Sequence, residues 1–217
     1  MSTLCHIKYD KYQDKFIETI DKYPPGFRSA TGPHQFNPEV IEIDNVKCFY
    51  INGTSSFINF WPDYNIDYLD EFTITIKCKL EKIGCIFSFT DRGSSPSIEY
   101  VGTLWVNSDS IEYSIIGNGA YHKEYLDDSI DIYAWHTWKY IYDHGNVMIT
   151  MDNSIISAHN FGSASKQTPI TGYSVIFNWN RDWNRYNSNG YINEFRLDDI
   201  VKNPINLLYS DFTIKNV

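Results

Sequence analysis

The sequence is poor in the residues that build helices. Its 217 residues include 8 leucines and 5 alanines against 28 isoleucines, and 17% of the chain is aromatic. Alanine and leucine favour helices, whereas isoleucine and aromatic residues suit pleated, half-buried strands. The composition therefore predicts one mostly β domain of the sandwich or barrel kind, with a folded core rather than disorder.

Positive charge is also scarce, since 18 Lys and Arg face 27 Asp and Glu and the formal net charge is −9. Nucleic-acid and anionic-membrane binders neutralise phosphates with Lys and Arg, so neither partner is expected. No stretch approaches the ~18 apolar residues of a membrane span, so no membrane insertion is expected. Residues 1–14 are polar and show no signal peptide, which favours a virion or cytoplasmic location over classical secretion.

Cysteines are few and lie in no metal-binding pattern. The four are Cys5, Cys48, Cys78 and Cys85. Without CxxC pairs or zinc-ligand spacing they are predicted to be small buried side chains. If Leu80 and Ile83 close a hairpin, Cys78 and Cys85 lie opposite each other near disulfide range. We expect them to be reduced, because no secretion signal is present.

Residues 1–38 differ from the rest of the chain. Apolar side chains recur every three or four residues, at Tyr9, Tyr12, Phe16, Ile20 and Tyr23. This spacing predicts an amphipathic helix over about residues 10–21, ended by the prolines that follow. Such a helical arm either packs on its own domain or attaches the protein to a partner.

From residue 39 to 217 short strands and turns alternate. Strict period-two alternation over 72–80 predicts a strand with Phe72, Ile74, Ile76, Cys78 and Leu80 on its buried face. Hairpins are predicted over 104–115 and 135–151, with a two-residue turn at 152–153 and further strands at 173–177 and 191–197. This order predicts an all-β, antiparallel sandwich of the jelly-roll type.

Several segments resemble the LamG-like, concanavalin A-like lectin/glucanase superfamily over about residues 40–212. They are an opening strand pair at 49–58, a strand at 69–74, a Trp–His strand at 135–143, a hairpin at 147–154 and a closing strand at 190–197. Asn153 stands where the family usually has Gly, and Asn193 where it has Asp. Residues 208–211 also resemble the lectin-like domain of clostridial neurotoxin binding regions. The fold hosts lectins, glycosidases, adhesion modules and toxin domains, so the resemblance implies no single function.

Signs of catalysis are weak. A glycosidase of this superfamily carries Glu-x-Asp-x-x-Glu, and the nearest match has Lys47 in place of the acid/base Glu after Glu42 and Asp44. His136 has no acidic partner at a recognisable spacing. Residues 63–67 have the alternating oxygen ligands of a calcium loop but lack its Gly and Glu. No enzyme and no cofactor are therefore predicted. A structural calcium is compatible with the resemblance, but no residues can be assigned as its ligands.

The strongest binding feature is the polar and aromatic loop over 178–190. Its flat aromatic faces and its hydrogen-bonding groups suit a sugar, which presents C–H faces and hydroxyls. The alternative is that one tryptophan fills the core and the charged pairs hold the loop. The candidate ligand-binding residues are Trp179, Arg181, Asp182, Trp183, Arg185 and Tyr186, with Trp183 the more exposed tryptophan. A second, weaker candidate is the loop 117–125.

These features favour a non-catalytic, lectin-like module that binds glycans. The alternative is a viral or phage virion protein that contacts neighbouring subunits, with assembly through the N-terminal arm. A third interpretation is a toxin-like receptor-binding domain.

Overall fold

The computed structural model describes residues 3–18, 26–29, 39–52, 56–60, 71–90, 100–115, 121–162, 173–176 and 188–198. These ranges form strands and turns, with no helix among them and hence no helix that could cross a membrane. The strands are β1 (Thr3–Asp10), β2 (Lys15–Glu18), β3 (Gly26–Ser29), β4 (Ile41–Ile43), β5 (Val46–Ile51), β6 (Ser56–Phe60), β7 (Glu71–Lys82), β8 (Gly84–Thr90), β9 (Tyr100–Val106), β10 (Ser110–Ser114), β11 (Tyr121–Tyr125), β12 (Trp135–Asp143), β13 (Asn146–Met151), β14 (Ser154–Asn160), β15 (Tyr173–Ile176) and β16 (Asn189–Asp198).

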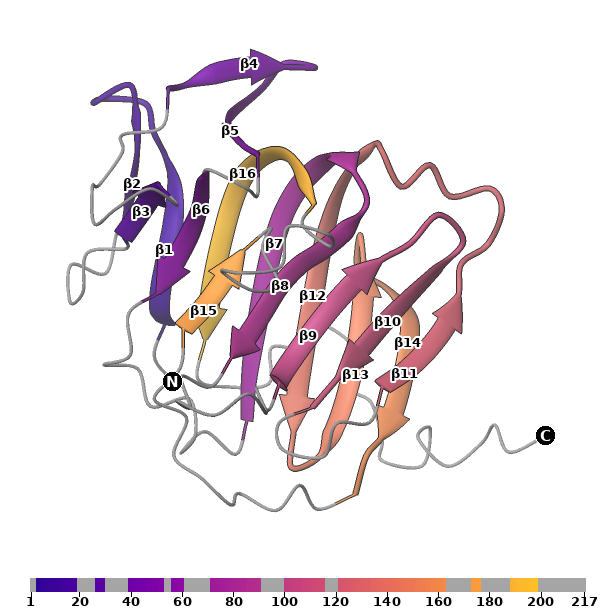
Figure 1. Ribbon diagram of the computed structural model, residues 1–217. Helices are drawn as coiled ribbons and strands as arrows, with labels where there is room; N and C mark the ends of the chain where they lie inside the picture. Colours follow the sequence, from indigo (N-terminus) through magenta and orange to yellow (C-terminus); the bar gives the residue numbers. More distant parts are fainter. Residues whose placement is uncertain are drawn as a thin grey trace.

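The strands form two antiparallel sheets that lie in two layers (Figure 1). One sheet has the order β14-β13-β12-β7-β16-β1-β2, and β5 joins it through β16 and carries β4. The other has the order β11-β10-β9-β8-β15-β6-β3. The prediction of an all-β antiparallel protein is confirmed.

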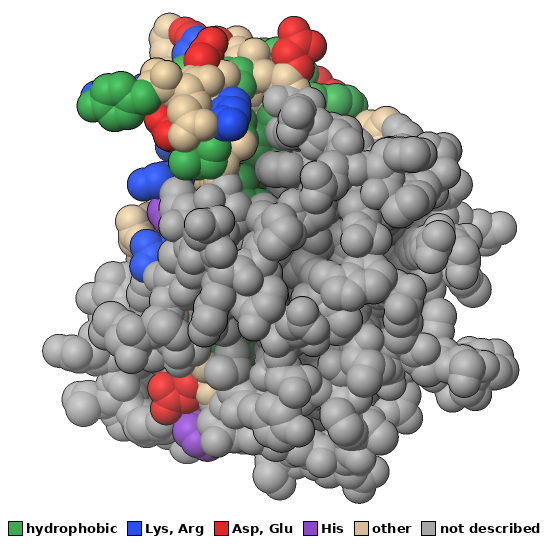
Figure 2. All heavy atoms as spheres, turned by 90° about the vertical axis from the view of Figure 1, so that its left-hand side faces the viewer, with side chains coloured by type: hydrophobic (Ala, Val, Ile, Leu, Met, Phe, Trp, Pro, Cys, Tyr) green, Lys and Arg blue, Asp and Glu red, His purple; other side chains and the backbone are tan. Residues whose placement is uncertain are grey.

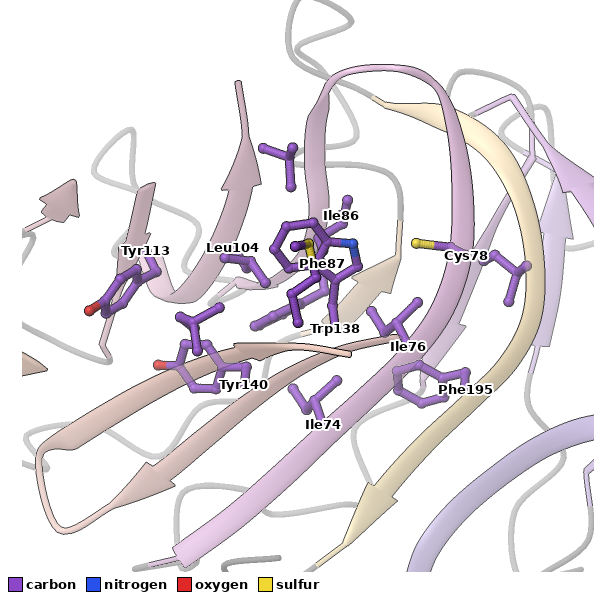
Figure 3. Close-up of a cluster of buried hydrophobic side chains, with 14 of the residues drawn as sticks. Ile74, Ile76, Cys78, Ile86, Phe87, Leu104, Tyr113, Trp138, Tyr140 and Phe195 are labelled. Carbon is purple, nitrogen blue, oxygen red and sulfur yellow. The ribbon is translucent and has the colours of Figure 1, made fainter. Parts of the chain in front are cut away.

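The core lies between the two sheets, and β7 shows how the sequence builds it. All five side chains predicted on its apolar face are buried, while Thr75, Lys77 and Lys79 lie on the other face and are partly exposed. Thr73, on that second face, is buried as well. Figure 3 shows Ile74 and Ile76 beside Trp138 and Tyr140 of β12 and Phe87 of β8.

The predicted hairpins are also present. Val106 pairs with Ile111, and Asp143 pairs with Asn146 across a two-residue turn. The turn between β13 and β14 has both central residues, Asp152 and Asn153, at positive φ. Two-residue hairpin turns favour a left-handed backbone conformation at both central residues, and Asn adopts this conformation readily.

The predicted N-terminal helix is wrong over the residues that the structure describes. β1 and β2 form a hairpin, and β1 also pairs with β16 inside the nine-stranded sheet. Tyr9 and Phe16 are directly opposed across this hairpin with ring centroids 5.7 Å apart, and Ile7 and Phe16 are buried in the core. Tyr12 lies in the turn and is 87% exposed. Over residues 9–16 the helix-like spacing thus comes from two strands and a turn, and Ile20 and Tyr23 lie outside the described residues.

The expected hairpin that would oppose Cys78 and Cys85 is wrong too. β7 belongs to one sheet and β8 to the other, so the chain crosses between layers at Ile83. Both cysteines are buried free thiols, as is Cys48, and burial raises the pKa of Cys78 far above its usual value. Buried thiols in apolar surroundings are chemically inert.

Candidate binding surface

The loop that carries the predicted ligand-binding residues lies outside the described residues. This holds for Trp179, Arg181, Asp182, Trp183, Arg185 and Tyr186 and for the calcium-like segment 63–67. From the second predicted loop, residues 121–125 are described and form strand β11.

The described residues carry a different candidate on the outer face of the nine-stranded sheet. Because residues directly opposite one another share a face, the strand register defines a row across four strands. Tyr50 of β5 pairs with Tyr191 of β16, Tyr191 pairs with Lys79 of β7, and Lys79 pairs with Trp135 of β12. We call these four residues, together with Asp44 and Glu81, the outer-face patch.

The two tyrosines form its aromatic part. Their ring centroids are 5.3 Å apart with the planes inclined at 53°, and Tyr50 is 39% exposed. The Tyr191 hydroxyl donates to Glu81 Oε1 at 2.6 Å. This hydrogen bond is the main reason that the pKa of Tyr191 rises to about 12, because the bond is lost when the hydroxyl ionises. Burial and the same carboxylate raise the pKa of Tyr50.

The β4–β5 hairpin supplies the charged part. Asp44 and Asn45 form its tip with positive φ angles, and Asp44 Oδ2 accepts from Lys79 Nζ at 2.5 Å. At the hairpin base Glu42 and Lys47 are paired at 2.8 Å. In Figure 2 the described side chains at the top of the molecule mix acidic, basic and hydrophobic groups on the face in view.

The glycosidase-like residues therefore serve as ion pairs. Glu42 contacts Lys47 and Asp44 contacts Lys79, so each carboxylate is held by a lysine rather than facing the other across a substrate site. A retaining glycosidase needs two carboxyl groups about 5 Å apart, one of them a proton donor. Here Lys47 stands at the position of the second catalytic carboxyl group and is paired with Glu42.

Trp135 completes the row. Its indole N–H is buried and has no hydrogen-bond partner, while the side chain as a whole is half-buried. A buried donor without an acceptor costs free energy. The Trp135 side chain therefore adds packing to the patch but no hydrogen bond from its indole N–H.

The arrangement suits a ligand with both apolar faces and hydroxyl groups. Tyr50 and Tyr191 offer ring faces, Asp44 and Glu81 accept hydrogen bonds, and Lys79 donates them. Since one lysine stands beside two carboxylates, a neutral ligand fits better than an anionic one.

His136 has the acidic partner that its sequence spacing did not reveal. Its Nδ1 lies 2.6 Å from Asp152 Oδ2, and its Nε2 lies 2.8 Å from the backbone oxygen of Asp131. The Thr137 amide donates to the other oxygen of Asp152 at 2.8 Å. Asp152 belongs to the turn after β13, so the contact depends on the three-stranded pairing of β12, β13 and β14. It ties the start of β12 to the turn between β13 and β14, with both ring nitrogens of His136 engaged.

One group among the described residues could hold a metal ion. Glu71, Asp143 and His144 bring three ligand atoms within 4.8 Å of one another at the β12–β13 turn. His144 Nδ1 lies 2.6 Å from Asp143 Oδ1, so these two ligand atoms already contact each other.

Comparison with known proteins supports the fold. No protein-family model matches the chain, and no curated protein sequence matches it significantly. Among solved structures it is similar to the binding domain of botulinum neurotoxin DC in complex with rat synaptotagmin II, at 15% identity and a TM-score of 0.61, over 98% of this chain and 50% of that one. The binding domain of serotype D/C matches at 13% identity and a TM-score of 0.64, over 92% and 49% of the two chains.

A third similar structure is that of botulinum neurotoxin type C, whose cell entry is described as dependent on two ganglioside molecules. It matches at 14% identity and a TM-score of 0.59, over 92% of this chain and 48% of that one. The chain thus spans about half the length of these binding domains. At such identities the likeness concerns the fold.

Proposed function

We propose that this chain is a non-catalytic recognition module that binds a glycan through the outer-face patch. The observation that carries the proposal is the row of Tyr50, Tyr191 and Lys79, which places two ring faces beside a donor and two carboxylate acceptors. Recognition surfaces commonly combine a few aromatic anchors with a polar surround. The loop residues from Trp179 to Tyr186 remain a second proposed contact.

The similar solved structures support recognition over catalysis, because they are receptor-binding domains. One of them is a complex with a protein, synaptotagmin II, so a protein receptor is the second candidate ligand. A toxin-like receptor-binding role is the form of this proposal that the neighbours favour. No observation on the described residues favours the virion alternative.

A glycan array probed with the labelled protein tests the proposal. The wild-type chain is expected to bind a subset of neutral oligosaccharides, and Tyr191→Ala is expected to weaken that binding by at least tenfold. Truncation of a central aromatic anchor typically costs ~2 kcal/mol or more, and ~1.4 kcal/mol corresponds to tenfold. Tyr191→Phe keeps the ring and loses the Glu81 contact, so it separates stacking from hydrogen bonding.

Tyr121→Ala is the matched control. Tyr121 is 45% exposed but lies on β11 of the seven-stranded sheet, whereas the patch lies on the nine-stranded sheet. It should bind as the wild type does. Loss of binding in both alanine variants, or in neither, contradicts the assignment of this patch.

A further inference from the structure

The seven-stranded sheet ends at β11, and no described strand pairs with the far side of this strand. The exposure of β11 alternates strictly. The side chains of Tyr121, Lys123 and Tyr125 are exposed, and Tyr125 is 67% exposed, whereas His122 and Glu124 turn towards β14 of the other sheet.

The register shows which backbone groups face this open edge. The amide of Leu126 donates to the carbonyl oxygen of Asp109 at 2.8 Å, and these two residues follow the pair Tyr125–Ser110. Hydrogen-bonded pairs alternate along an antiparallel ladder. The even-numbered residues of β11 therefore exchange hydrogen bonds with β10, and the N–H and C=O groups of Lys123 and Tyr125 point away from it.

Contacts with β14 hold this edge in place. The rings of His122 and His159 are stacked with centroids 4.1 Å apart, and Ser157 Oγ donates to Glu124 Oε2 at 3.2 Å. The Ser157 hydroxyl also lies 2.7 Å from the buried Tyr113 hydroxyl. A strand that is already ordered loses less conformational entropy when a partner binds.

The surroundings of the edge are acidic. Asp109, Asp127 and Asp128 are exposed near the end of β11, and the Glu124 side chain is 44% exposed. Lys123, the cation of this strand, lies 4.8 Å above the Tyr125 ring. A second copy of the chain would bring the same carboxylates and be repelled, whereas a basic segment would be attracted.

We propose that the open edge of β11 binds an extended basic peptide segment of a protein partner by strand addition. The backbone groups of Lys123 and Tyr125 pair with the peptide backbone. Apolar peptide side chains lie over the two exposed tyrosines, and the alternate basic side chains lie opposite Glu124. This surface is separate from the outer-face patch and lies on the other sheet.

The test uses a fluorescent ten-residue peptide of alternating lysine and valine, titrated with the intact protein. Tyr125→Pro removes the outward N–H and blocks an added strand, while proline is tolerated at a sheet edge. Tyr125→Val keeps the N–H and removes the ring. We expect the proline variant to bind at least about tenfold more weakly than the valine variant.

Two further probes decide between strand addition and simple charge attraction. The same peptide with N-methyl groups on alternate amides keeps its charge but cannot add a strand, and it should not bind. A peptide of alternating glutamate and valine should bind more weakly than the parent. The proposal is overturned if the N-methylated peptide binds as tightly as the parent, if the parent shows no binding at about 1 mM, or if a folded Tyr125→Pro variant binds normally. If circular dichroism shows that this variant is unfolded, the N-methylated peptide alone gives the answer.

Discussion

Replacing Gly190 with alanine should destabilise the protein by about 2–5 kcal/mol, because the new methyl group has no room between β16 and β7. A Cβ at this position would lie 2.2 Å from the backbone oxygen of Lys79 and 3.0 Å from Leu80 Cα. Real Cβ contacts essentially never fall below 3.0 Å, so the backbones must separate by at least 0.8 Å, which is 3.0 minus 2.2. Overpacking of this kind costs ~1–3 kcal/mol, and the φ of +153° adds ~1–2 kcal/mol for a residue with a side chain.

Thermal unfolding followed by circular dichroism measures this cost. A loss of about 3 kcal/mol lowers the Tm of a domain this size by about 6–12 °C. Gly162→Ala is the matched control, since Gly162 also has a positive φ, +79°, but nothing lies within 4 Å of its added Cβ. The control should lose only the backbone contribution, ~1–2 kcal/mol. Equal Tm values for the two variants would refute the steric argument.

Four further predictions concern the N-terminal hairpin, two histidines and one tryptophan. Deleting residues 1–18 removes strands β1 and β2 with the buried side chains of Ile7 and Phe16, so the shortened chain should lose its cooperative unfolding transition in urea. An unchanged transition would mean that the β1–β2 hairpin is dispensable for the fold. His136→Ala breaks contacts at both ring nitrogens and should cost about 1–3 kcal/mol in the same assay, whereas an unchanged midpoint would mean that the contacts add nothing. Burial, and then His122, lower the pKa of His159, so the unfolded chain binds the extra proton and stability should fall as the pH drops through ~6.5; His159→Gln should flatten that fall. Trp183→Ala should keep the Tm and weaken ligand binding, and a Tm many degrees lower would instead identify a core tryptophan.

The parts of the fold that depend on local physics could be predicted from the sequence. The alternation over β7 sets which side chains are buried, because successive side chains of a strand point to opposite faces. The turn at Asp152 and Asn153 needs left-handed residues, and Asn supplies one. Both features are decided within a few residues of chain.

The two incorrect predictions concern segments whose local sequence pattern is compatible with two different structures. Apolar residues three or four apart at Tyr9, Tyr12 and Phe16 fit one face of a helix, but they equally fit two paired strands with an exposed turn between them. Alternation also resumes after the polar pair Glu81 and Lys82, whether the chain turns back within a sheet or crosses to the other layer. Only contacts with distant strands choose between these structures.

The outer-face patch shows why alternation of side chains along a strand does not always predict which residues form a binding surface. Strict alternation along β16 would place Tyr191, Asn193 and Phe195 on one face, so the burial of Phe195 would predict a buried Tyr191. The register instead shifts between Ile192 and Glu194, and the extra residue, Asn193, donates from Nδ2 to the backbone oxygen of Lys47 at 2.8 Å. An aspartate at this position could not donate that hydrogen bond when ionised. The bulge therefore lets one strand send Phe195 into the core and Tyr191 to the outer face, and Asn193 anchors the bulge to β5.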